Sequence, residues 1–166
     1  MYLDEFFDYK NQLMKDLLMS EEVCALLKDE DLPEGASLAY TRIFPYEYVP
    51  ETVEYGGTYI CFDVDVESVQ DGMLLFPTIS VWVFSHKSKL RLPNGGGVRT
   101  DKLCCEISKV INGSRYYGLG ELNLSRVRRF APMTDYQGKC MVFSAKEFNR
   151  LSPTGKSIPA NRKIGR

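Results

Sequence analysis

Three carboxylates recur at every second position of one segment. Asp63, Asp65 and Glu67 alternate with apolar residues in TYICFDVDVES, and side chains that alternate in this way share one face of a β-strand. Carboxylates at this spacing can hold Mg²⁺ or Mn²⁺ for hydrolysis. The solvent-facing side of an antiparallel strand has the same pattern, and no second carboxylate cluster or catalytic lysine motif accompanies these residues. We therefore keep a metal-dependent hydrolase or nuclease as the alternative function and assign no metal ligands.

The other signals for catalysis or cofactor binding are weaker. His86 is the only histidine, and nothing in the sequence places a cysteine beside it. Gly-Lys-Ser at 155–157 resembles the end of a phosphate-binding P-loop, but the glycine that this motif needs five residues earlier is Arg150. The glycines at 95–97 could present backbone amides to an anion, although alone they are better explained as a loop. We predict no catalytic residue and no cofactor, so the protein is not expected to be an enzyme.

A basic cluster follows a predicted strand in the second half of the chain. Arg126, Arg128 and Arg129 stand within four residues of one another. The net charge of −1 does not supply the broad basic footprint of a nucleic-acid-binding domain. The cluster could line a passage for DNA, meet the acidic segment of a neighbour, or form a solvated strand end.

Charge is distributed unevenly along the sequence. Residues 1–54 hold thirteen acids and four bases, a net charge of −9, whereas the remainder has a net charge of +8. A molecule with one acidic and one basic part can attract copies of itself head to tail. Two separately solvated faces would be the alternative, because halves of a sequence need not occupy different faces.

The composition is that of an ordinary globular domain. The 166 residues are 44% hydrophobic and 26% charged, which suits one domain with a sizeable core. The five cysteines are odd in number and show no Cys-x-x-Cys spacing, so reduced and mostly buried thiols are expected. No apolar run is long enough for a membrane helix, and the N-terminus lacks the pattern of a signal peptide. We expect the protein to be assembled in a cytoplasm, and we expect it not to associate with a membrane.

Hydrophobic periodicity predicts an α+β fold with the order α-α-β-β-β-α-β-β. The predicted elements are two N-terminal helices, the second capped by Ser20, a short strand with an extended aromatic loop over 38–57, a strand from 58, a hairpin turn at 70–72, a central strand over 73–85, a helix capped by Thr100 and ended by Asn112-Gly113, and strands over 118–127 and 139–143. The sheet is therefore a mostly antiparallel one of four to five strands, crossed by a second main helix.

The predicted core lies between this sheet and the helix from Thr100. Its members are Ile60, Phe62, Val64, Val81, Val83, Ile107 and Ile111. Leu3, Phe6, Phe7, Leu13, Met14, Leu17 and Leu18 are expected to form the buried stripe of the first helix. Residues 1–150 are predicted to form one domain, followed by an extended basic C-terminal tail over 151–166 that contains Lys156, Arg162 and Lys163.

Several stretches resemble the tail-completion or tail-terminator (neck) proteins of tailed bacteriophages. They are RIFPYEYVP at 42–50, the strand start TYIC at 58–61, His86 at the close of the next strand, GVRTD at 97–101 and GLG at 118–120. The likeness covers the order of elements over residues 1–150. It implies a ring, usually a hexamer, that completes the tail tube and joins it to the head connector. It implies no catalytic residues.

The resemblance makes the expected function that of a structural virion protein of a phage neck or tail. Its partners would be copies of itself, the tail tube protein and the head-tail connector protein, with DNA only as passing cargo. Its location would be the virion, after assembly in the host cytoplasm. The residues expected at subunit or partner interfaces are Tyr46, Tyr48, Arg126, Arg128, Arg129, Lys156, Arg162 and Lys163.

Overall fold

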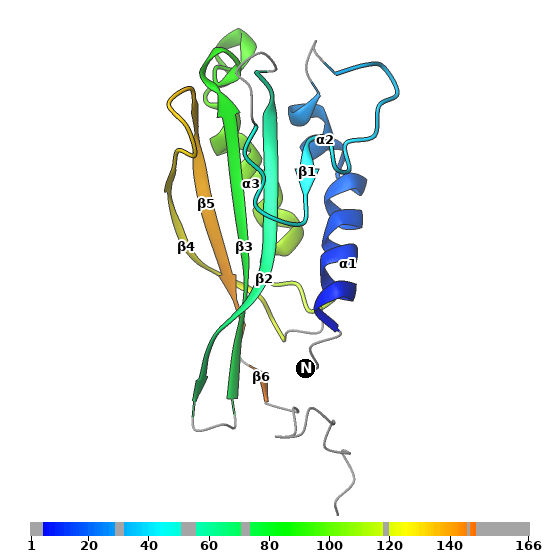
Figure 1. Cartoon of the computed structure of the whole chain (residues 1–166), viewed down its shortest axis with the longest axis vertical. Helices are drawn as coiled ribbons and strands as arrows, with labels where there is room; N and C mark the ends of the chain where they lie inside the picture. Colours follow the sequence, from blue (N-terminus) through cyan, green and yellow to red (C-terminus); the bar gives the residue numbers. More distant parts are fainter. Residues whose placement is uncertain are drawn as a thin grey trace, which may run out of the picture.

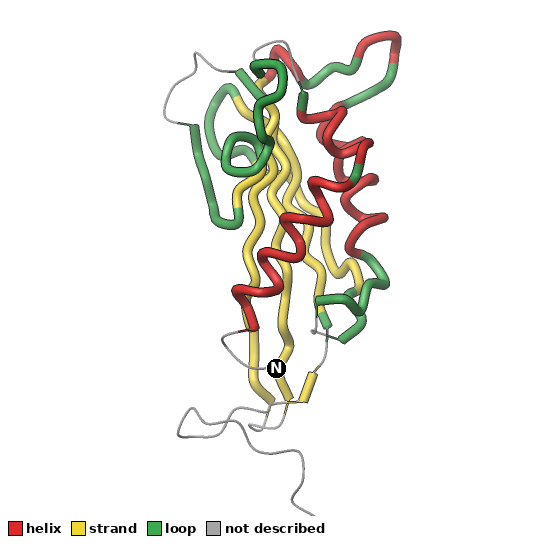
Figure 2. The backbone as a smooth tube through the Cα atoms, turned by 90° about the vertical axis from the view of Figure 1, so that its right-hand side faces the viewer, coloured by secondary structure: helices red, strands yellow, loops and turns green. Residues whose placement is uncertain are grey.

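Three helices cover one face of a mostly antiparallel sheet, so the predicted α+β class is confirmed (Figure 1, Figure 2). The computed structural model describes residues 5–28, 32–50, 56–70, 74–117, 120–145 and 147–148. Within them the helices are α1 (Glu5–Met19), α2 (Glu21–Leu27) and α3 (Arg99–Ile111). The strands are β1 (Ile43–Phe44), β2 (Thr58–Gln70), β3 (Leu74–His86), β4 (Asn123–Phe130), β5 (Tyr136–Ser144) and β6 (Glu147–Phe148).

The strand order β1-β2-β3-β5-β4 places β3 in the middle of the sheet, as its apolar character on both faces predicts. β1 runs parallel to β2, and the pairs formed by β2 with β3, β3 with β5 and β4 with β5 are antiparallel. The short β6, which the sequence did not predict, pairs with the start of β3. β4 is left at the edge of the sheet, far from β1.

The core on the helix face follows from alternation in the strands. Ile60, Phe62 and Val64 of β2 all face the helices and are at most 5% exposed. The same cluster contains the other predicted members, Val81, Val83, Ile107 and Ile111, together with Leu13, Leu17, Val23 and Leu27 from α1 and α2. The predicted core and its register are therefore confirmed.

Aromatic rings form a second cluster on the opposite face. Tyr59, Phe84 and Tyr136 are buried there, and the Tyr59 and Phe84 ring centroids are 5.5 Å apart. Tyr48, from the loop after β1, stacks on Phe44 with 4.1 Å between centroids. The extended loop thus packs by its aromatic side chains, as expected, and covers part of this face.

Local capping explains two helix ends and corrects one prediction. The Ser20 hydroxyl accepts a hydrogen bond from the Val23 amide, which confirms it as the N-cap of α2. Thr100 is not the cap of α3: the helix begins at Arg99, Val98 takes the cap position and Thr100 is buried in the first turn. The reason is that the Arg99 amide donates to the Leu90 carbonyl at 2.7 Å, which holds the chain in place before Thr100.

Three other predicted details differ. Phe7, expected in the buried stripe of α1, is 72% exposed. β4 begins at Asn123 instead of 118, because Leu122 exchanges backbone hydrogen bonds with Gly113 and Ser114 after α3. β5 begins at Tyr136, which pairs with His86 at the end of β3. The predicted tail over 151–166 lies outside the described residues.

Truncating the core on α3 provides a first test. Ile107 is fully buried, so Ile107→Ala is expected to lower the free energy of unfolding by about 2–5 kcal/mol. Cys105→Ala, at an exposed position of the same helix, is the control and should change it by less than about 0.5 kcal/mol. Urea denaturation would measure both, and equal effects would contradict the assigned helix face.

A second test uses the close approach of β5 to β3. A Cβ atom on Gly138 would overlap the Val83 carbonyl oxygen, a backbone atom that cannot turn aside. Gly138→Ala is therefore expected to cost at least about 1–3 kcal/mol of stability, or to prevent folding. The neighbouring Gln137→Ala, at an exposed position, should be nearly neutral in the same melting experiment.

Candidate functional site

The carboxylates of β2 are not gathered into a metal site. Asp63 forms an ion pair with Lys10 of α1, with 2.5 Å between Oδ1 and Nζ, and Asp65 is exposed. Among the residues that the structure describes, no group of three or more His, Cys, Asp or Glu side chains could hold a metal ion. The hydrolase alternative therefore gains no support from the geometry.

The histidine and the thiols occupy structural positions. His86 Nδ1 lies 2.7 Å from the Ser88 hydroxyl, and its ring packs edge-on against Tyr136. All five cysteines are free thiols, and three of them are buried, as expected. Burial raises the pKa of the Cys61 and Cys104 thiols to about 12, so neither forms a nucleophilic thiolate near neutral pH.

The three predicted interface arginines lie on β4 but not together. Arg126 and Arg128 pair with Val142 and Cys140 and project from the face that carries the aromatic cluster. Arg129 pairs with Lys139 and projects from the helix face. The bulge between Leu124 and Arg126 shifts the alternation by one residue, so Leu124 and Val127 both project from the helix face. The arginines therefore serve two different surfaces, which sequence proximity alone concealed.

β4 is an uncovered edge. Every residue from Asn123 to Arg129 is exposed, including Leu124 at 38% and Val127 at 48% on the helix face. None of the arginines at 126, 128 and 129 forms an ion pair within the described part of the chain. An exposed strand edge with apolar and unpaired basic side chains is suited to contact an acidic protein surface.

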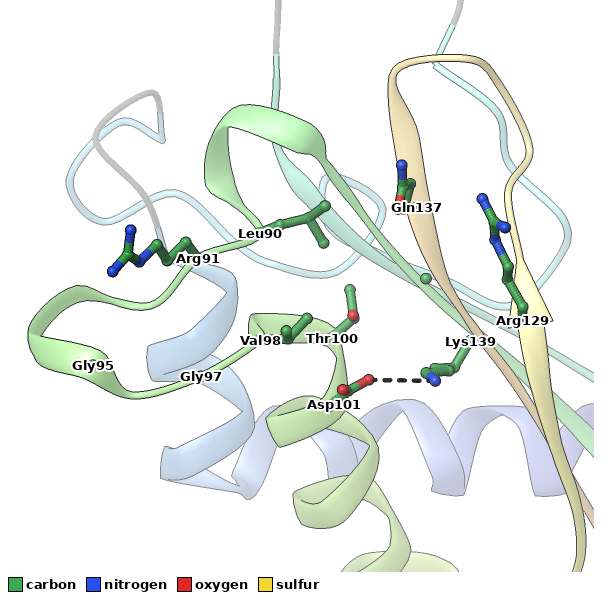
Figure 3. Close-up of a pocket in the computed structure, with 11 residues that line it drawn as sticks. Leu90, Arg91, Gly95, Gly97, Val98, Thr100, Asp101, Arg129, Gln137 and Lys139 are labelled. Carbon is green, nitrogen blue, oxygen red and sulfur yellow. Dashed lines mark ion pairs between the residues drawn. The ribbon is translucent and has the colours of Figure 1, made fainter.

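A hollow of about 590 Å³ lies beside the upper end of β4, and we call it the socket (Figure 3). It is bounded by the loop that leads into α3, the first turn of α3 and the adjoining ends of β4 and β5. Its lining residues are Leu90, Arg91, Gly95, Gly97, Val98, Thr100, Asp101, Arg129, Gln137, Gly138 and Lys139. The side chains of Leu90 and Val98 give it an apolar wall.

The socket carries an excess of positive charge. Arg91, Arg129 and Lys139 line it together with a single carboxylate, that of Asp101, and Figure 3 shows the Arg91 side chain directed away from Asp101. The Lys139 Nζ to Asp101 Oδ1 distance is 3.7 Å and both side chains are about half exposed, so this pair is weak and leaves the ammonium group accessible. Among the described residues no side chain caps the N-terminus of α3, whose dipole adds to the positive potential. The socket therefore favours an anionic group joined to an apolar one.

The two predicted tyrosines differ in availability. Tyr46 is 46% exposed, with its ring tilted against Phe44 at 5.7 Å. Tyr48 is half-buried and held between Phe44 and Tyr59, so it packs the protein's own surface. The remaining predicted interface residues, Lys156, Arg162 and Lys163, lie outside the described residues.

The junction of α1 and α2 presents the opposite charge. Met19 is 71% exposed there, and Glu21 and Glu22 in the first turn of α2 are exposed. We call these three residues the corner. The sequence analysis treated the two glutamates only as the start of a helix. It also did not predict that Arg91 and Lys139 line the same hollow, because 48 positions separate them. The sequence does not show that the loop before α3 lies beside the start of β5, and this proximity is what brings the two residues together.

No helix in the described part of the chain is long and apolar enough to cross a membrane.

Comparison with known proteins places the chain in one family. A search of curated proteins found no match. The family model named YomW matches residues 12–145, which run from the middle of α1 to the end of β5 and so include the core, the corner and the socket. The family takes its name from a gene of the Bacillus phage or prophage type. The chain belongs to the YomW family and is a phage-derived protein.

Proposed function

We propose that this protein is a structural part of a phage neck or tail, where copies join head to tail into a ring. The ring would complete the tail tube and connect it to the head connector. The phage-derived family and the resemblance of the sequence to tail-terminator proteins support this proposal. The observation that carries it is that the two edges of the sheet differ in charge, one being basic and the other acidic.

The basic side is the β4 edge, and the acidic side holds α1 and α2. Figure 1 draws α1 and α2 beside β1 and β2, with β4 beyond β5 on the other side. A contact between two unlike surfaces of identical chains is heterologous, and such contacts build closed rings when the rotation between copies closes. Opposite charges on the two surfaces favour this head-to-tail order over a symmetric dimer, in which like charges would meet.

The partners outside the ring follow from the same role. The tail tube protein and the head connector protein would contact the two rims, and DNA would pass through as cargo. The hydrolase reading is not pursued, because the carboxylate of Asp63 is already held by Lys10. The protein acts, in this proposal, by assembly and not by catalysis.

Self-association is the direct test. At low salt and high protein concentration the full chain is expected to form a ring of several subunits, most simply six, visible in electron micrographs and by native mass spectrometry. Raising ionic strength to about 1 M shortens the Debye length to about 3 Å and should weaken the assembly. A strictly monomeric mass at low salt and high concentration would contradict the proposal.

The basic C-terminal tail can be tested by deletion. Residues 151–166 contain four bases and no acid, so the isolated segment cannot bury enough apolar surface to offset a chain entropy of about 1–2 kcal/mol per residue. Deleting them is expected to leave the melting temperature of the domain unchanged while weakening assembly. Loss of the folded domain on deletion would instead assign the segment to the core.

A further inference from the structure

We infer that the socket of one copy receives the corner of the next copy, as the specific contact that joins the ring. The inference rests on the proposed function and names the residues that make the contact. It requires that the two sites have complementary chemistry, that they lie on either side of α3, and that both are exposed in the single chain.

The chemistry of the two sites is complementary. The socket combines three cations with an apolar wall made by Leu90 and Val98. The corner combines two carboxylates, Glu21 and Glu22, with the exposed Met19 directly beside them in the sequence. Seating Met19 against the wall would bring both carboxylates toward the cations. A volume of about 590 Å³ lies within the range of about 300–1,000 Å³ that binding pockets use, so a side chain of this size fits.

The positions of the two sites suit a ring. The corner lies at the α1–α2 junction beside β1 and β2, and the socket lies between α3 and the adjoining ends of β4 and β5, so that α3 stands between them on the helix side of the sheet (Figure 1). Both lie toward the end of the molecule that carries the loop from Leu90 to Val98 (Figure 1). Copies turned about a common axis can therefore bring the corner of one to the socket of the next at the same height.

Both sites are exposed within one chain, and among the socket cations Lys139 has a carboxylate partner there, Asp101. Arg91 and Arg129 form no ion pair within the described ranges, and neither do Glu21 and Glu22. The glutamates do stabilise the start of α2 through the helix dipole, but that role leaves their carboxylates exposed. Val98, on the socket wall, is 45% exposed. In a single chain the socket and the corner therefore each expose an apolar group and several charges to solvent, and a second copy would cover them.

Nucleic acid fits the socket less well than protein does. A phosphate backbone is bound by basic and polar side chains. It would form no favourable contact with the exposed apolar residues Val98, Val127 and Leu124 that adjoin these cations. The presence of Asp101 inside the socket also opposes a polyanion. A protein segment with few carboxylates and an apolar side chain satisfies all of these groups.

Charge reversal in two different chains tests the contact. The socket variant combines Arg129→Glu with Lys139→Glu, which leaves one base and three carboxylates in the lining, and the corner variant combines Glu21→Arg with Glu22→Arg. Each variant alone is expected to self-associate about tenfold more weakly or worse, measured by sedimentation equilibrium, because like charges then meet. Mixing the two should restore assembly, since the reversed corner fits the reversed socket and the unaltered corner fits the unaltered socket.

The mixture has a signature that no general charge effect produces. Restored rings must alternate between the two variants, so native mass spectrometry should show even subunit numbers with equal amounts of each chain. The matched control combines Arg126→Glu with Arg128→Glu: it makes the same charge change at the β4 edge but on the opposite face. Mixing this control with the corner variant should not yield alternating rings. Melting curves would show that each variant is folded.

The outcomes separate this inference from the proposed function. If the unaltered chain never assembles, both are wrong. If it assembles and the socket variant does not weaken it, the ring stands and the socket is not its contact. If the socket variant weakens assembly but mixing with the corner variant fails to restore it, the socket receives another group and the inference is overturned.

Discussion

Burial of both faces of β3 is the constraint on which the rest of the molecule depends. Val81 and Val83 of this strand need cover on one face, and Phe84 needs cover on the other. Three helices supply the first cover, while the aromatic side chains around Tyr59 and Tyr136 supply the second. Because α1 and α2 pack on β2 and α3 packs on β3 and β5, the helices do not cover β4, whose exposed residues become available for contact.

The edge left in this way is protected as well as exposed. A long flat apolar edge strand would pair indiscriminately with other strands, and charged side chains on the edge prevent this. Arg126 and Arg128 on one face and Arg129 on the other make simple strand pairing between two copies unfavourable, because their like charges would meet. The same arginines allow contact with an acidic surface. The same three arginines thus disfavour pairing between two β4 edges and favour contact with an acidic surface.

Local patterns were sufficient for the elements and the core. The alternation of Ile60, Phe62 and Val64 gave the correct face because a period of two admits one register against a buried layer. Ser20 was found as a cap because its hydrogen bond spans three residues. Thr100 was misassigned because the start of α3 is fixed by the carbonyl of Leu90, nine positions before Arg99, and no local propensity encodes that contact.

The candidate site was harder to predict than the fold for the same reason. Arg128 and Arg129 are adjacent in sequence yet serve opposite faces, whereas Arg91 and Lys139 are distant in sequence and line one hollow. Only the pairing of strands decides which charges act together.

A closed ring requires a fixed contact direction in addition to opposite charges, because charge attraction alone would also permit filaments and random aggregates. Direction must come from shape, and the socket supplies it: a hollow with an apolar wall accepts a protruding side chain in few orientations. Rigid support on both sides keeps that direction constant from copy to copy. The corner begins at Met19, two residues after Leu17, which is fully buried in the core. The socket is built on β5, whose Met141 and Phe143 are buried in the same core. The contact angle is therefore carried through one packed cluster, so each subunit passes the same rotation to the next, and a constant rotation is the condition under which a head-to-tail chain can close.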